Sequence, residues 1–213
     1  MSTDISSDAP VRPLFDTWQV QSASSWTIRP RVEGRASARE CNAWYAQQAA
    51  DSLRSLGTWM RPWRVAAYVP ETTAHAEQRL KFEWPPDASP AAFLSHVMGQ
   101  VRETSGRIDD LTMELDLYVW FRTAESPHQP VRAWLRAPTD LQVAGASEGR
   151  EAYLNLSIAH SVFAAETWQR GNNGELHALN QPLLGQALAC WEQNLGPIIE
   201  IDGVNVFKYG FAD

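Results

Sequence analysis

The chain has few of the residues that support covalent, redox or metal chemistry. Only two of its 213 residues are cysteines, Cys41 and Cys190, each among apolar positions of an expected helix. We therefore expect two reduced, buried thiols, with a structural disulfide as the alternative. None of the five histidines stands at metal-ligand spacing from another ligand, and the phosphate-binding patterns GxGxxG and GxxxxGK[ST] are absent. The sequence thus predicts no cofactor, no metal and no catalytic motif.

Basic side chains and long apolar runs are also scarce. Eighteen basic residues stand against 25 acidic ones, and this net charge of −7 argues against nucleic-acid binding. No apolar run approaches the roughly 20 residues of a membrane-spanning helix. Residues 1–10 lack the apolar core of a signal peptide. We expect a cytoplasmic protein that binds neither nucleic acid nor membrane.

The acidic excess is confined to the second half of the chain. Residues 1–106 carry 11 acidic and 11 basic side chains, whereas residues 107–213 carry 14 acidic and seven basic ones. An acidic surface can attract a basic partner and speed its association. Simple solubility is the alternative explanation.

Tryptophan is the abundant large side chain. The chain has ten tryptophans, against seven phenylalanines and five tyrosines. Each indole can bury roughly 150–250 Å². Because the ten are spread along the chain from Trp18 to Trp191, we expect most of them to fill one continuous core. A small-ligand site built from a few exposed rings is the alternative.

Three helices are predicted from apolar spacing and from capping signals. The first follows Ser37, which forms a capping box with Glu40. The second is capped by Ser89 and has a proline in its first position. The third is expected to begin near Asn180 and to end at Gly196.

Ten strands are expected between and around these helices. The clearest covers residues 111–123, where apolar and polar residues alternate. The others cover residues 14–20, 25–32, 63–69, 79–84, 131–136, 141–144, 151–159, 198–201 and 204–211. An Asp202-Gly203 turn between the last two predicts a hairpin.

The order of these elements determines the predicted fold class. Strands come in groups joined by short turns, without regular βαβ alternation. This order predicts an α+β fold, with a mostly antiparallel sheet and about three helices packed on it. We expect a flexible N-terminus at residues 1–12 and a single α+β domain at residues 13–213.

The densest charge feature lies at the start of the clearest strand. Glu114 and Asp116 alternate on one face, which places their side chains roughly 7 Å apart. Tyr118 and Trp120 share that face, and large rings beside acids are typical of an interface for a basic partner. The candidate partner-binding residues are Asp109, Asp110, Glu114, Asp116, Tyr118 and Trp120. The alternatives are a plain solvated face, a general acid–base pair, or a site for a hard cation.

The runner-up interpretation is an enzyme, such as a hydrolase, with a site assembled from dispersed residues. His160 is its candidate base, because it ends an expected strand next to Ser161. Neighbours in sequence do not by themselves make a nucleophile and base, since that pairing requires convergence in space and an orienting acid.

The chain resembles the immunity proteins of bacterial polymorphic-toxin and contact-dependent-inhibition systems. The resemblance rests on the size and acidity of the chain, on its α+β pattern and on its lack of a catalytic motif. It also rests on the sequence of roughly the last 60 residues. The segments concerned are Leu179-Asn180-Gln181-Pro182-Leu183-Leu184, Ala189-Cys190-Trp191-Glu192, Ile199-Glu200-Ile201-Asp202-Gly203 and Tyr209-Gly210-Phe211. It carries over no functional residue.

This resemblance implies a function in protein binding. We expect a non-enzymatic, immunity-type protein that neutralises a cognate bacterial toxin by direct contact. The charge asymmetry predicts that this toxin has a basic surface.

Overall fold

The computed structural model describes residues 3–4, 24–30, 37–70, 77–85, 88–104, 106–145, 151–167, 171–203 and 205–211. The strand expected at residues 14–20, Trp18 and Trp168 lie outside the described residues. Most of the segment at residues 1–12, which was expected to be flexible, also lies outside them. Its Thr3 and Asp4 form a short strand, β1.

An eight-stranded sheet forms the centre of the described structure. The strand order is β10-β2-β7-β6-β5-β3-β4, and β1 pairs in parallel with the beginning of β6. All other neighbouring pairs in this sheet are antiparallel. The bounds are β1 Thr3–Asp4, β2 Ser24–Ile28, β3 Met60–Pro70, β4 Glu77–Glu83, β5 Asp110–Phe121, β6 Val131–Ala144, β7 Tyr153–Ile158 and β10 Ile198–Asp202.

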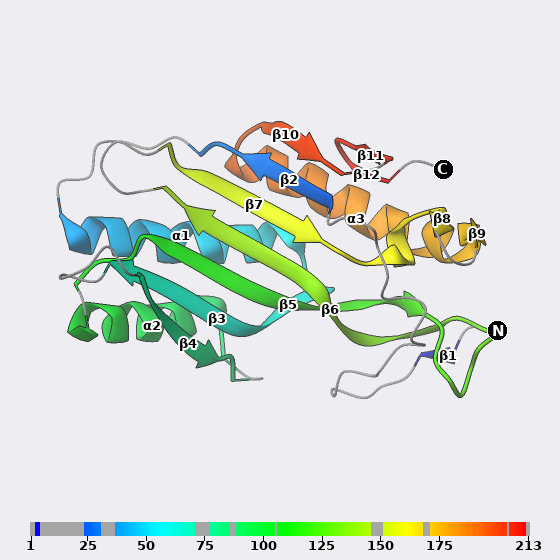
Figure 1. Cartoon of the computed structure of the whole chain (residues 1–213), viewed down its shortest axis with the longest axis horizontal. Coiled ribbons are helices and arrows are strands. Elements are labelled where there is room, and N and C mark those ends of the chain that lie inside the picture. Colours follow the sequence, from blue (N-terminus) through cyan, green and yellow to red (C-terminus); the bar gives the residue numbers. More distant parts are fainter. Residues whose placement is uncertain are drawn as a thin grey trace.

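Three α-helices of the described chain cover one face of this sheet (Figure 1). They are α1 Ala38–Leu56, α2 Pro90–Thr104 and α3 Gly174–Leu195. Short elements complete the structure: the 3₁₀ helix η2 Ser161–Phe163, and the strands β8 Glu166–Thr167, β9 Gly171–Asn172, β11 Val206–Phe207 and β12 Gly210–Phe211. The predicted α+β fold with a mostly antiparallel sheet is confirmed.

The core lies between the sheet and the helices. The predicted alternation along β5 is confirmed, because its helix-facing side chains are all 0% exposed: Leu111, Met113, Leu115, Leu117, Val119 and Phe121. Of the eight tryptophans in the described ranges, five are buried: Trp26, Trp44, Trp59, Trp84 and Trp191. Trp63, Trp120 and Trp134 are half-buried. Cys41 is buried, Cys190 is half-buried, and both are thiols.

The capping signals in the sequence predicted the starts of α1 and α2 correctly. The Ser37 hydroxyl accepts a hydrogen bond from the Glu40 amide, and the Glu40 carboxylate accepts one from the Ser37 amide at 3.0 Å. At α2, Ser89 accepts from the Ala92 amide at 3.4 Å. No helix in the described ranges has both the length and the apolar character needed to cross a membrane.

Three expected boundaries are wrong. Helix α3 begins at Gly174 rather than near Asn180, so Pro182 lies inside it. The strands expected at residues 131–136 and 141–144 form the single strand β6, which bulges around Pro138 opposite β5 and stays paired on both sides of it. Finally, β10 pairs with β2, while β11 pairs with β12, so the hairpin predicted at Asp202-Gly203 does not form.

Candidate binding face

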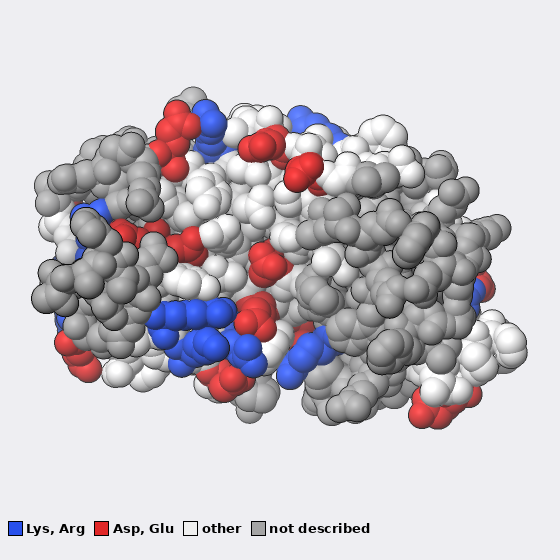
Figure 2. Space-filling model, viewed as in Figure 1, with Lys and Arg blue, Asp and Glu red and all other residues white. Residues whose placement is uncertain are grey.

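The sheet face opposite the helices carries most of the residues that were singled out in the sequence. In Figure 1 the helices lie behind the sheet. Figure 2 is drawn from the same side, so it shows the sheet face that the helices do not cover. Thr112, Glu114, Tyr118 and Trp120 of β5 are half-buried on this open face. The prediction that these residues share a face with Asp116 agrees with the strand register. The bulge between the two strands lies on β6, so the side chains of β5 alternate without interruption.

Asp116 is not a solvated carboxylate, contrary to the expectation of an acidic surface. Its side chain is only 1% exposed, and Arg136 from β6 grips it with two contacts, Nε to Oδ1 at 3.0 Å and Nη2 to Oδ2 at 3.3 Å. Arg61 from β3 adds a third contact, Nε to Oδ2 at 3.7 Å. A buried carboxylate needs such partners because an unpaired buried charge is costly.

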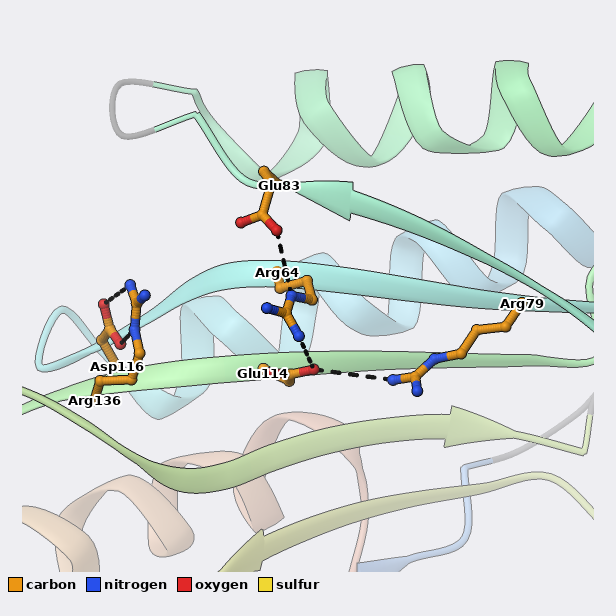
Figure 3. A network of polar contacts seen from close by, with 6 residues as sticks. All are labelled: Arg64, Arg79, Glu83, Glu114, Asp116 and Arg136. Atoms are coloured by element: carbon orange, nitrogen blue, oxygen red, sulfur yellow. Dashed lines mark hydrogen bonds and ion pairs between the residues drawn. The ribbon is translucent and has the colours of Figure 1, made fainter.

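Glu114 is also paired with arginines. Arg64 Nη1 lies 3.2 Å from Glu114 Oε1, and Arg79 Nη2 lies 3.9 Å from the same oxygen. Arg64 also reaches Glu83 of β4, with Nε 3.4 Å from Oε1. Figure 3 shows Arg64 between the two glutamates and Arg136 against Asp116.

The other candidate acids have partners nearby. Asp109 lies 3.6 Å from Arg107 Nε, and its side chain is 19% exposed. Asp110 accepts hydrogen bonds from Thr112 and Gln142. The expected free acidic patch around Glu114 and Asp116 is therefore wrong, because arginines from neighbouring strands neutralise it. A partner-binding role for Asp109, Asp110, Glu114, Asp116, Tyr118 and Trp120 stays a prediction.

Arginine side chains on this face stack on aromatic rings. The guanidinium carbons of Arg64 and Arg136 lie 4.1 and 3.9 Å from the Trp63 ring centroid. Arg61 lies 3.9 Å from the Trp134 ring. On β5, Tyr118 packs against Trp134 with centroids 5.3 Å apart, and Arg132 lies 4.9 Å from the Tyr118 ring. Cation–π contacts of this kind stabilise the rotamers of both partners.

A hollow of about 1000 Å³ opens beside these stacks, and we call it the Arg–Trp hollow. Its walls come from the end of α1, the start of α2, the end of β4, and strands β3, β5 and β6. The charged and aromatic side chains that line it include Arg61, Trp63, Trp84, Asp116, Trp134 and Arg136. Its size is at the upper end of the range for ligand pockets.

A second group of charges lies farther along the face, on β5 and β6. Burial raises the pKa of the Asp140 carboxyl, and the nearby negative charges of Glu114 and Asp110 raise it further. In Figure 2 the basic side chains gather over β3 and β4 with acidic ones among them, and further acidic side chains lie scattered towards β6 and β10. The open face thus carries pairs of arginines and carboxylates over β3 and β4, and mostly acidic charges towards β10.

The candidate catalytic base, His160, lies in the interior of the protein and not on this face. His160 is 0% exposed, and burial lowers its pKa to about 3, so the imidazole stays neutral near pH 7. Its Nδ1 accepts a hydrogen bond from the Val162 amide at 3.2 Å, which caps η2. A buried, helix-capping histidine does not reach a solvent-borne substrate.

Comparisons with protein-family models, with curated proteins and with solved structures found no match to this chain. Within the described residues, no three His, Cys, Asp or Glu side chains cluster in a way that could hold a metal ion.

Proposed function

We propose that this chain is a cytoplasmic, immunity-type binding protein that neutralises a cognate bacterial toxin by direct contact through its open sheet face. The observation that carries the proposal is the set of Trp, Tyr and Arg side chains held around the Arg–Trp hollow. These three residue types dominate the binding energy of protein interfaces. They are also the residues on this face that stack on one another.

The stacks favour tight binding for an entropic reason. Ordering a long side chain at an interface costs about 0.5–1.5 kcal/mol. Arg61 and Arg136 already lie against Trp134 and Trp63, at 3.9 Å each, and both pair with Asp116. A partner that docks here therefore meets side chains that have lost most of this freedom before binding.

The charge division determines what kind of partner fits. A toxin with a wholly basic surface would match Asp110 and Asp140, but over β3 and β4 it would meet carboxylates that already pair with arginines. We therefore propose a partner that is basic opposite β6 and acidic opposite β3. Net charge alone predicted a toxin with a basic surface, so this proposal changes the expected partner.

Co-expression tests the proposed function. The toxin domain encoded beside this chain's gene is induced in bacteria with or without this chain, and growth is measured. We expect the chain to restore growth to that of uninduced cells. The proposal is wrong if no toxin gene lies beside it, or if the toxin stops growth equally in both cultures.

A further inference from the structure

Exposed large apolar side chains gather at one border of the sheet. The described residues contain four of them, each between 41% and 60% exposed: Ile199, Ile201, Phe207 and Tyr209. The two isoleucines belong to β10, which forms this border, and the two rings lie just after it in the chain (Figure 1). Apolar groups that are exposed together in one place are typical of an interaction site.

The backbone of β10 is also open to a further strand. Among the described strands, β10 pairs with β2 alone. Successive residues of a strand direct their N–H and C=O groups to opposite sides, so alternate residues of β10 offer theirs on the side away from β2. We call this side of Ile198–Asp202 the β10 edge.

The opposite border of the sheet is protected, whereas the β10 edge is not. Strand β4 carries exposed charges of both signs at Arg79, Lys81 and Glu83. Charged side chains, above all lysine, are a common means of preventing another strand from adding to a border. Strand β10 contains no lysine, arginine or proline.

The two faces of β10 differ in chemistry. Ile201 lies opposite the buried Trp26 of β2, so its side chain is on the side of the sheet that the helices cover. Glu200 lies opposite Thr27 and is therefore on the open face, and Asp202 shares that face. Both acids line a hollow of about 380 Å³ there. A strand added at the β10 edge thus meets an apolar side chain on one face and carboxylates on the other.

The acids of this hollow exceed its bases. Its lining contains the carboxylates of Glu151, Glu200 and Asp202 and one basic side chain, Arg29. Arg29 Nη1 lies 2.9 Å from Glu151 Oε2. Asp202 accepts a hydrogen bond from the Gly203 amide at 2.9 Å, which leaves its charge unbalanced. Within the described residues, neither Glu200 nor Asp202 has a basic partner.

We propose that the β10 edge binds an extended segment of a partner protein, which adds a strand to the sheet and carries lysine or arginine at every second position. Neighbouring strands lie about 4.8 Å apart, so these basic side chains lie beside Glu200 and Asp202 on the open face. The residues between them pack beside Ile201. Backbone hydrogen bonds supply affinity in this mode of binding, and the alternate side chains supply specificity.

This surface is separate from the one assigned to the toxin. Its hollow shares no lining residue with the Arg–Trp hollow. The inference therefore goes beyond the proposed function and does not depend on it.

A second copy of the chain matches the β10 edge less well than a basic segment does. Two β10 strands that pair antiparallel about a twofold axis bring Glu200 and Asp202 of one copy against the same acids of the other. Like charges that lie opposite each other destabilise a strand pair. Residues 14–20, the expected strand outside the described residues, contain Asp16 and no basic residue, so they do not supply the missing charge either.

Synthetic peptides test the proposal on the intact chain. A peptide of about eight residues in which lysine alternates with valine is titrated into the isotope-labelled protein, and its backbone amide signals are followed by NMR. We expect the signals of residues 199–202 to shift, with a dissociation constant below about 1 mM. A peptide with the same lysines in one block controls for net charge, and one with glutamate in place of lysine controls for its sign. We expect each control peptide to bind about 5-fold or more weakly. Equal binding by either control, or shifts confined to other parts of the chain, contradicts the proposal.

Charge reversal on β10 gives a second test. Glu200→Lys is expected to weaken binding of the lysine peptide by about 5-fold or more and to remove the preference over the glutamate peptide. The matched control is Glu125→Lys, which makes the same charge change at an exposed position between β5 and β6. We expect the control to bind within about 2-fold of the wild type. Equal losses in the two variants would show that net charge, and not the β10 edge, attracts the peptide.

Sedimentation of the free protein tests the competing occupant. We expect the wild type and Ile201→Lys to sediment alike, as monomers, at the concentration used for NMR. If the wild type is a dimer and Ile201→Lys is a monomer, a second copy occupies the β10 edge and the proposal is wrong.

Discussion

Replacing Asn180 with alanine is expected to lower the free energy of unfolding by about 3 kcal/mol. Asn180 of α3 is 0% exposed, and its amide group bonds to the backbone of two other elements. Oδ1 accepts from the Trp120 amide at 2.9 Å, and Nδ2 donates to the carbonyls of Trp120 at 2.8 Å and Val162 at 3.2 Å. Each buried group left without its bond costs about 1–3 kcal/mol.

The position of Trp120 explains why this amide has so large an effect. Strand β3 begins at Met60, which pairs with Leu117, so the end of β5 has no β3 residue beside it. The Asn180 side chain takes the place of the missing strand, because an amide offers the same donor and acceptor as a peptide group. A side chain from α3 thus bonds to the end of β5 that β3 does not reach.

Thermal unfolding followed by circular dichroism measures this effect. A loss of about 3 kcal/mol corresponds to a fall in Tm of about 6–12 °C for a chain of this length. The control is Asn194→Ala, which removes an exposed asparagine of the same helix that donates one bond to Ser55 at 3.0 Å. We expect about 1 kcal/mol for the control. Equal effects at the two positions would show that Asn180 does not take the place of the missing strand.

Arg136→Ala is expected to lower the free energy of unfolding by about 2 kcal/mol. Among the described residues, it leaves Asp116, which is 1% exposed, with the 3.7 Å contact to Arg61 as its remaining ion pair. Removing one partner of a fully buried ion pair costs about 3–5 kcal/mol. The expected value is lower because Arg136 is 46% exposed and water already screens it.

A second substitution separates the charge effect from lost packing on Trp63. In the Arg136→Ala background, Asp116→Asn removes a buried negative charge that has lost its two short contacts, so the stability measured by urea unfolding is expected to rise again. Arg64→Ala is the control, because its partners Glu114 and Glu83 are 30% and 75% exposed, and we expect a loss of about 0–1 kcal/mol. If Asp116→Asn lowers stability further, the charge balance at Asp116 is not what holds the cluster together.

Short-range signals in the sequence were sufficient to predict much of the fold. The caps of α1 and α2 lie within three residues of each helix start, and the alternation along β5 is continuous. The start of α3 lacks such a signal. Asn173 does not cap the helix with its side chain, which donates instead to the carbonyls of Ser161 and Ala164. At Pro138 the strand continues because β5 pairs with β6 on both sides of the bulge, and β7 pairs with β6 from Thr139 onwards.

The candidate site was predicted less well, because its chemistry depends on strand register. The acids of β5 were visible in the sequence, but their partners Arg61, Arg64 and Arg136 come from β3 and β6. One local signal did exist. Arg132, Trp134 and Arg136 alternate with apolar residues along β6, the pattern of a strand with one arginine–tryptophan face.

Isothermal titration calorimetry decides whether the open face is the docking surface. It measures the affinity of the purified toxin domain for the double variant Trp63→Ala/Trp134→Ala. Phe207→Ala is the control, since it truncates a 60% exposed ring on β11 that does not line the hollow. We expect the double variant to bind about 100-fold or more weakly than the wild type, and the control to bind within about 3-fold of it. Wild-type affinity in a folded double variant would contradict the assignment of this face.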